Sequence, residues 1–233
     1  MSDERGYTLI ELLVGTMVAM VVFGAILTVI QVSVRVQADN AQRVAINQRG
    51  RPAMTRIIER LHASCMAPGL APVQVGSGDS TMVLLSKPGS DVAPMPDRYL
   101  IGLSGDTLIE EDFPAIGGEA PEWTFATKPD SYFEIVDGVE QARLGKPAAP
   151  TPLFRYYAYE DANDDGKVET VLLDTPLDEE AAARAVQVNI AFKVTARSGS
   201  EDDADGSITL TDSATLRIEP ASEDSAQVNL PCV

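Results

Sequence analysis

The feature that most constrains this chain is an uninterrupted apolar segment near its N-terminus. From Leu12 to Ile30 the sequence reads LLVGTMVAMVVFGAILTVI, and no charged side chain interrupts it. A helix rises about 1.5 Å per residue, so this segment nearly matches a hydrocarbon core about 30 Å thick. A core helix of a soluble domain would present a polar face. The segment therefore predicts a membrane-spanning helix, which covers residues 7–30 when the preceding residues are included.

The flanks of the segment indicate that it stays attached to the mature chain. A secretory signal has a shorter apolar region, and a small-residue cleavage site follows it. Here Thr28 to Arg35 reads TVIQVSVR, with no A-x-A pattern. We therefore expect an anchor that is kept after export.

One acidic residue, Glu11, stands at the start of the segment between Ile10 and Leu12. An ionised carboxylate inside a bilayer costs about 3 kcal/mol or more unless it has a partner. Two interpretations fit these residues. Either Glu11 lies at the headgroup level and reaches water, or it waits for a cation that another chain supplies.

Residues 5–14, RGYTLIELLV, resemble the prepilin-type cleavage and methylation motif of the type IV pilin superfamily. The resemblance implies that a membrane aspartyl peptidase removes residues 1–6 as a leader by cutting between Gly6 and Tyr7. The same enzyme would then N-methylate Tyr7. It also implies that Glu11 neutralises the terminal amine of a neighbouring subunit during assembly. Two charges that are costly in apolar surroundings would then become one pair.

The same resemblance implies a minor pilin or pseudopilin, a structural subunit of a type IV pilus or a type II secretion-like filament and not an enzyme. Its partners would be other pilins or pseudopilins, the prepilin peptidase, the inner-membrane assembly platform and membrane lipid. The chain would cross the cytoplasmic membrane once, with its head extracytoplasmic, before entering the filament. A hypothesis from another class is a single-span anchored domain that acts alone and binds calcium or another ligand.

Helical spacing continues after the apolar segment and predicts an amphipathic half over residues 31–66. Gly50 and Pro52 interrupt it, and Pro52 is expected to kink or restart the helix. An apolar stripe follows and is expected to pack against a sheet; it comprises Met54, Ile57, Ile58, Leu61 and Cys65.

Residues 67–233 are predicted to form a head with an antiparallel sheet, because short runs alternate apolar and polar side chains. The segment from Thr175 to Asp178, TPLD, is expected to start a short helix with Pro176 in its first turn, and the helix continues into EEAAARA. The fold class is therefore α+β, a long N-terminal transmembrane and spine helix packed on a sheet, which is the pilin arrangement that the resemblance implies. The predicted strands are Met82–Ser86, Arg98–Gly102, Thr107–Glu111, Tyr132–Val136, Leu153–Tyr159, Val168–Leu173, Ala185–Ala196 and Ser207–Ile218.

Charge is distributed unevenly in a chain whose formal net charge is -17. Six arginines between residues 31 and 62 stand against Asp39 and Glu59, a net of +4, whereas the rest of the chain is strongly acidic. Such an acidic protein repels phosphates, so no direct nucleic-acid binding is predicted. The basic part of the helix is expected to contact acidic heads of neighbouring subunits.

The two cysteines, Cys65 and Cys232, are too few for a closed thiolate zinc site. They are either free or paired with each other. If the head lies outside the cytoplasm, a bridge between them would stabilise the fold by about 4–5 kcal/mol, by loop-closure entropy. It would also tie the C-terminus to the end of the first helix.

An acidic segment, DANDDGKVE, begins like a calcium loop, because oxygen ligands alternate before a turn-making glycine. Leu172 occupies the twelfth position, where such a loop has glutamate, and D-D-G also makes a hairpin turn. A plain turn and a calcium-stabilised turn therefore both remain open, and no other cofactor is expected. The candidate ligands are Asp161, Asn163, Asp165 and Glu169.

No catalytic residue is predicted. His62 is the only histidine, and no serine or cysteine nucleophile signature surrounds it. The sequence also lacks a glycine-rich phosphate loop and an H-E-x-x-H zinc motif.

Overall fold

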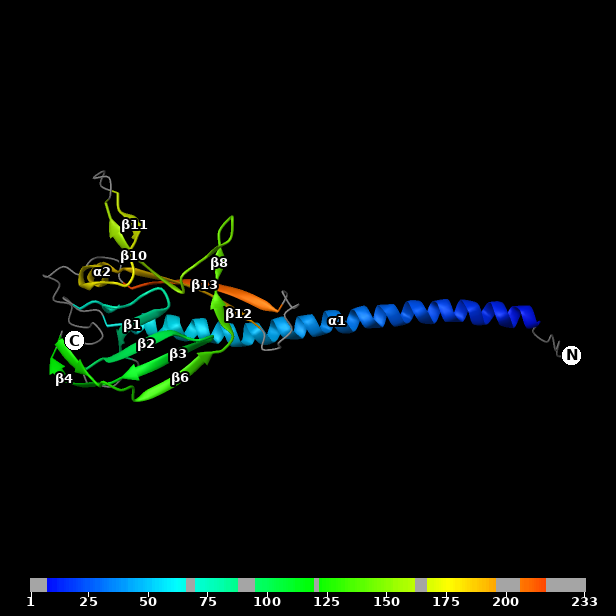
Figure 1. Cartoon of the computed structure of the whole chain (residues 1–233), viewed down its shortest axis with the longest axis horizontal. Coiled ribbons are helices and arrows are strands. Elements are labelled where there is room, and N and C mark those ends of the chain that lie inside the picture. Colours follow the sequence, from blue (N-terminus) through cyan, green and yellow to red (C-terminus); the bar gives the residue numbers. More distant parts are fainter. Residues whose placement is uncertain are drawn as a thin grey trace. The chain divides into compact units, whose positions relative to one another are not determined.

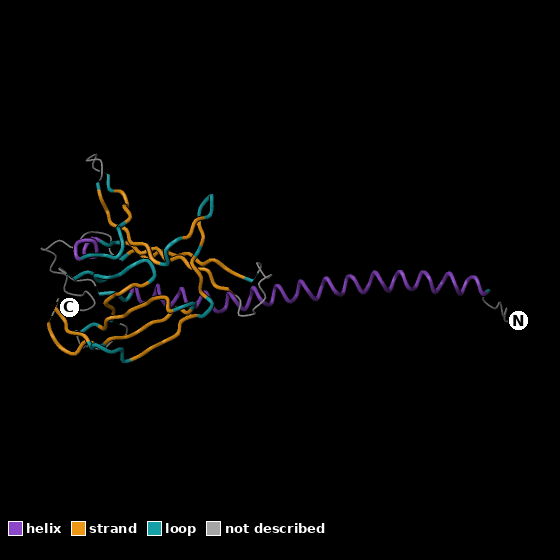
Figure 2. The backbone as a smooth tube through the Cα atoms, viewed as in Figure 1, coloured by secondary structure: helices purple, strands orange, loops and turns teal. Residues whose placement is uncertain are grey.

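The computed structural model describes residues 8–65, 70–87, 95–119, 122–161, 167–195 and 206–216. The chain forms two compact units, Met1–Ala45 and Ile46–Val233. The helix α1 (Leu9–His62) begins in the first unit and ends in the second. Helix dominates the described residues of the first unit, whereas strands dominate the second (Figure 1, Figure 2).

The first part of α1 carries apolar side chains on all sides, and they are exposed through residue 36. The two hydroxyl groups between Leu12 and Ile30 bond within the helix: Thr16 donates to the carbonyl of Leu13 at 2.9 Å and Thr28 to that of Ala25 at 2.8 Å. Its polar groups are thus satisfied internally, as a bilayer requires. Among the described residues, α1 is the one helix long and apolar enough to cross a membrane, as the sequence predicted.

In the second unit, one face of α1 is buried. The side chains at 46, 50, 53, 54, 57 and 61 of this face recur at helical spacing, which confirms most of the predicted stripe. The helix ends at His62, so Cys65 lies beyond it. Between them, the backbone of Ser64 forms an isolated antiparallel β-bridge with that of Ser86. Pro52 does not interrupt α1, which continues through it to His62, and its ring is exposed.

Two antiparallel sheets enclose the buried face of α1 (Figure 1). The first has the strand order β1-β2-β3-β6, and a hairpin of β4 and β5 follows β3. These strands are β1 (Thr81–Ser86), β2 (Asp97–Ser104), β3 (Thr107–Phe113), β4 (Ala115–Glu119), β5 (Glu122–Phe125) and β6 (Ser131–Val136).

The second sheet has the order β11-β10-β12-β13, and β7 also pairs with β12. Val188, Ile190, Phe192 and Val194 of β12 are buried at alternate positions, as the period of two predicts. A separate two-stranded pair is formed by β8 and β9. The strands are β7 (Val139–Gln141), β8 (Arg143–Leu144), β9 (Ala149–Pro150), β10 (Phe154–Glu160), β11 (Glu169–Leu172), β12 (Gln187–Thr195) and β13 (Ser207–Thr215).

The short helix α2 (Glu179–Arg184) starts later than the sequence predicted. Its N-cap is Asp178, whose carboxylate accepts a hydrogen bond from the backbone N–H of Ala181 at 2.8 Å. An aspartate cap satisfies one of the free N–H groups at the helix start. The helix thus begins after the last residue of the predicted start segment, and the placement of Pro176 in its first turn is wrong.

The α+β class with an antiparallel sheet is confirmed, and each predicted strand overlaps an observed one. The strands β4, β5, β7, β8 and β9 were not predicted. They are two to five residues long and have little apolar alternation, so the period of two gives no signal there. One core joins α1, both sheets and α2, and of these short strands β7 contributes Val139 to it. Trp123 and Phe125 of β5 pack against a second, smaller cluster.

Gly50 marks the closest approach of α1 to the second sheet. A Cβ atom there would lie 2.6 Å from Cδ1 of Leu210 on β13 and 3.4 Å from Cγ2 of Val194 on β12. Glycine is a poor helix former, so its presence inside α1 is explained by this contact. A larger side chain at this position must displace Leu210 or push the helix away from the sheet.

We expect Gly50→Leu to lower the free energy of unfolding of the head by about 1–3 kcal/mol, because overpacking outweighs the gain in helix propensity. Denaturant unfolding followed by the fluorescence of Trp123, the single tryptophan, measures the effect. Gly24→Leu serves as the control, since open space surrounds Gly24 in the same helix. Equal stability of the two variants would contradict the close approach.

Candidate functional site

Glu11 makes a reciprocal pair of hydrogen bonds with Thr8 at the start of α1. The backbone N–H of Thr8 donates to Oε2 of Glu11 at 3.1 Å, and the N–H of Glu11 donates to Oγ1 of Thr8 at 3.3 Å. The hydroxyl of Thr8 donates to the same carboxylate oxygen at 3.0 Å. This is a capping box, in which the T-x-x-E spacing satisfies free N–H groups at a helix start.

The capping box adds a role for Glu11 that the sequence reasoning missed, although the Thr8-x-x-Glu11 spacing signals it. Both residues are exposed, so the carboxylate has an internal partner and is also accessible from outside. The predicted cleavage residues Gly6 and Tyr7 lie outside the described residues. Pairing of Glu11 with the amine of another chain stays a prediction.

Cys65 is fully buried and disulfide-bonded. It packs with Leu70 and Leu85, and the rings of Trp123 and Phe125 cover this small cluster. The expected partner Cys232 lies outside the described residues, so the pairing of these two positions stays a prediction.

The four calcium candidates fall around the connection between β10 and β11. Asp161 follows β10 directly, and Glu169 begins β11 opposite Glu160. Asn163 and Asp165 lie outside the described residues. In the described ranges no group of three or more His, Cys, Asp or Glu side chains could hold a metal ion. Asp161 and Glu169 thus lie at the two ends of the segment that connects β10 to β11. Calcium binding stays a prediction.

A charged cluster between α1 and the first sheet was not predicted. Glu110 of β3 is only 3% exposed, and it is the one charged residue among the buried polar residues of the described chain. Arg56 donates to its two oxygens through Nε and Nη2, both at 3.0 Å. Arg60 donates through Nε at 3.2 Å and Nη2 at 2.8 Å, both to Oε1. Two guanidinium groups one helical turn apart therefore share one carboxylate.

Each guanidinium of the cluster also covers an aromatic ring. The Cζ atom of Arg56 lies 3.9 Å from the ring centre of Phe133, and that of Arg60 lies 4.2 Å from the ring centre of Tyr99. Such cation–π contacts strengthen when water is excluded. The cluster thus connects α1 to β2, β3 and β6.

The charges of the cluster are coupled. Burial raises the pKa of the Glu110 carboxyl, but hydrogen bonds from Arg56 and Arg60 outweigh it and hold the pKa below its ordinary value of 4.5. Burial raises the pKa of the nearby Asp112 carboxyl, and the charge of Asp97 raises it further. Glu110 is therefore the carboxylate that stays ionised against the helix.

Three arginines of the basic part of α1 pair within the head, whereas contact of this part with neighbouring subunits stays a prediction. Arg56 and Arg60 bind Glu110, and Arg49 forms an ion pair with Asp137 between β6 and β7. Much of the positive charge thus holds the helix on its own head. The sequence signal was the spacing of Arg56 and Arg60 by four residues beside the apolar stripe. Nothing in the sequence identified Glu110 as their partner.

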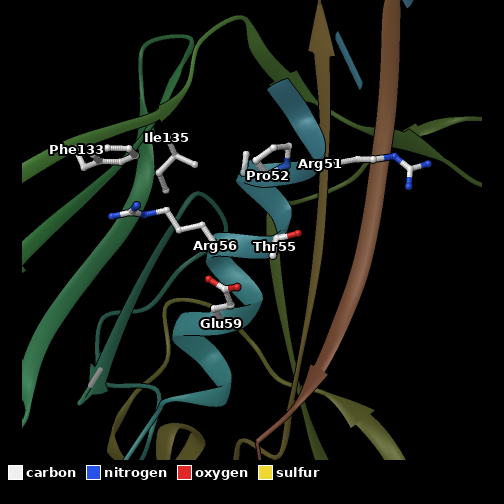
Figure 3. Close-up of a pocket in the computed structure, with 8 residues that line it drawn as sticks. Arg51, Pro52, Thr55, Arg56, Glu59, Phe133 and Ile135 are labelled. Carbon is white, nitrogen blue, oxygen red and sulfur yellow. The ribbon is translucent and has the colours of Figure 1, made fainter. Parts of the chain in front are cut away.

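A groove of about 560 Å³ lies beside the cluster, between α1 and β6. Arg56 reaches from the helix toward Phe133, whereas Arg51 leaves the helix on the other side (Figure 3). The remaining lining is Pro52, Ala53, Thr55, Glu59 and Ile135. None of the predicted site residues lines this groove.

Comparisons with protein-family models, with curated proteins and with solved structures found no match to the chain.

The charged cluster predicts a pH dependence of stability. Because the pKa of Glu110 is lower in the folded chain, its contribution is present above the ordinary value of 4.5 and is lost as the pH falls below it. We expect Glu110→Gln to melt several degrees below the wild type at about pH 7, and this gap to shrink toward about pH 3.

Thermal unfolding followed by circular dichroism at a series of pH values measures this gap. Glu134→Gln is the control, because Glu134 is exposed on the neighbouring β6. A gap between Glu110→Gln and the wild type that is the same at both ends of the pH series would contradict the prediction.

Proposed function

We propose that this chain is a pilin-like structural subunit, a minor pilin or pseudopilin, that is assembled into a filament through α1. The observation that carries the proposal is Glu11, an acidic residue at the start of a helix whose next nineteen or so residues are apolar on every side. The capping box accounts for an acceptor at this position, but glutamine would supply one without a charge. A subunit that must align its helix with the amine of another chain needs the charge as well.

The chemistry of the pairing follows from the proposed processing. Cleavage between Gly6 and Tyr7 creates an α-amine four residues before Glu11. When helices pack in apolar surroundings, an unpaired amine and an unpaired carboxylate are both costly, and bringing them together removes both penalties. The pair would therefore fix the alignment of neighbouring subunits along the filament.

The capping box with Thr8 is compatible with this role. Its three hydrogen bonds use one carboxylate oxygen and the Thr8 hydroxyl, and they fix where the carboxylate lies. A carboxylate has acceptor sites on two oxygens, so one oxygen can cap the helix while the other receives an amine.

The exposed apolar helix supports the same proposal. Residues 9–36 present large apolar side chains that are mostly about half or more exposed, such as Leu9 at 83% and Met20 at 76%. Such a surface needs lipid or other apolar helices around it. A subunit that moves from the cytoplasmic membrane into a filament of packed helices satisfies the need in both places, with its head extracytoplasmic.

The decisive variant is Glu11→Gln, because glutamine can replace glutamate in a capping box but carries no charge. We expect the variant to reach the membrane fraction normally and to fall at least about tenfold in the sheared filament fraction, measured by immunoblot. Stranding one charge of a buried pair costs about 3–5 kcal/mol, and about 1.4 kcal/mol already corresponds to tenfold.

Glu59→Gln is the matched control, since Glu59 is an exposed glutamate of the same helix in the head. Thr8→Ala tests the capping role alone and is expected to lower incorporation less than Glu11→Gln. Incorporation of Glu11→Gln at the wild-type level would refute the proposal that the charge of Glu11 aligns subunits.

A further inference from the structure

The buried face of α1 does not by itself fix where the helix lies along its axis. This face consists of Ile46, Gly50, Ala53, Met54, Ile57 and Leu61. The residues four positions further on are Gly50, Met54, Ile57, Ile58, Leu61 and Cys65. Both sets are apolar or glycine, so a slip of one turn that brings this second set to the buried face would still bury an apolar stripe. The opposite slip would bring Gln42 and Arg49 to the buried face, so the stripe itself opposes it. Against the first slip, other contacts must select the register.

The charged cluster, unlike the apolar stripe, loses contacts when α1 slips by one turn in either direction. The i+4 row through Arg56 and Arg60 continues to Pro52 on one side and Ser64 on the other. After a slip of one turn in either direction, one guanidinium position would be taken by proline or serine. Glu110 would lose half of its donors, and Phe133 or Tyr99 would lose its cation.

We infer that the cluster of Arg56, Arg60 and Glu110 is a register lock, which holds α1 at one axial position on the first sheet. A buried carboxylate that loses its donors is penalised far more than an apolar contact that shifts. Replacing a whole buried ionic cluster by apolar side chains often leaves stability unchanged, whereas its best-attested role is to specify register.

A steric contact supports the same register from the second sheet. Gly50 lies against Leu210, and a slip of one turn would bring Ile46 or Met54 to this position. The lock and this contact act on opposite sides of α1, since Glu110 belongs to β3 and Leu210 to β13. The inference concerns the head alone, so it does not depend on the proposed function.

The test measures the distance between spin labels on the exposed residues Glu59 of α1 and Ser104 of β2, by double electron–electron resonance on the full chain in detergent micelles. Cys65 is disulfide-bonded and does not take the label. Leu210→Ala, which removes the steric contact, is the common background. On this background the lock is replaced by Arg56→Met, Arg60→Met and Glu110→Leu.

Leu210→Ala alone is expected to give one narrow distance, because the lock remains. The variant without the lock is expected to melt within about 5 °C of that background. It should also show a second distance, displaced by up to about 5 Å, the rise of one helical turn. The matched control removes an exposed ion pair on the same background through Lys193→Met and Glu140→Leu, whose charged atoms lie 2.9 Å apart. This control should keep one distance.

A single unchanged distance in the variant without the lock would overturn the inference. Failure of that variant to fold, while Leu210→Ala alone folds, would also overturn it. The cluster would then be a source of stability and not a device for register.

Discussion

The rest of this structure depends on one constraint: the first part of α1 is apolar on every side, and its side chains are exposed. Water is therefore not the environment of these residues, and lipid or other helices must surround them. The second part of the same helix is amphipathic and is buried on one face by two sheets. One helix thus serves two environments, and the change of pattern from uniform to one-sided marks where the head begins to pack.

The sequence predicted the elements whose pattern is long and regular. The run from Leu12 to Ile30 and the alternation of Val188, Ile190, Phe192 and Val194 each extend over several periods, so the helix and β12 follow directly. The local pairs β4–β5 and β8–β9 are too short for a period of two to reveal them, and β7 pairs with the distant strand β12. Pro52 was expected to kink or restart α1, but the helix runs through it without a break.

The candidate site was predictable only where its signal is local. Glu11 stood out because a charge is improbable in an apolar run, and its bond with Thr8 follows from the T-x-x-E pattern, in which the two residues are three positions apart. Glu110 could not be paired with Arg56 and Arg60 from the sequence, because about fifty residues separate them and only folding brings them together. Three of the six arginines between residues 31 and 62, Arg49, Arg56 and Arg60, consequently pair with acidic residues of the head itself.

The measurement that tests the central claim most directly is the intact mass of the protein isolated from the membrane of the cells that produce it. The account predicts a chain that begins at Tyr7 and carries one methyl group on its terminal amine. A mature chain that retains residues 1–6, in cells that contain an active prepilin peptidase, would contradict the account.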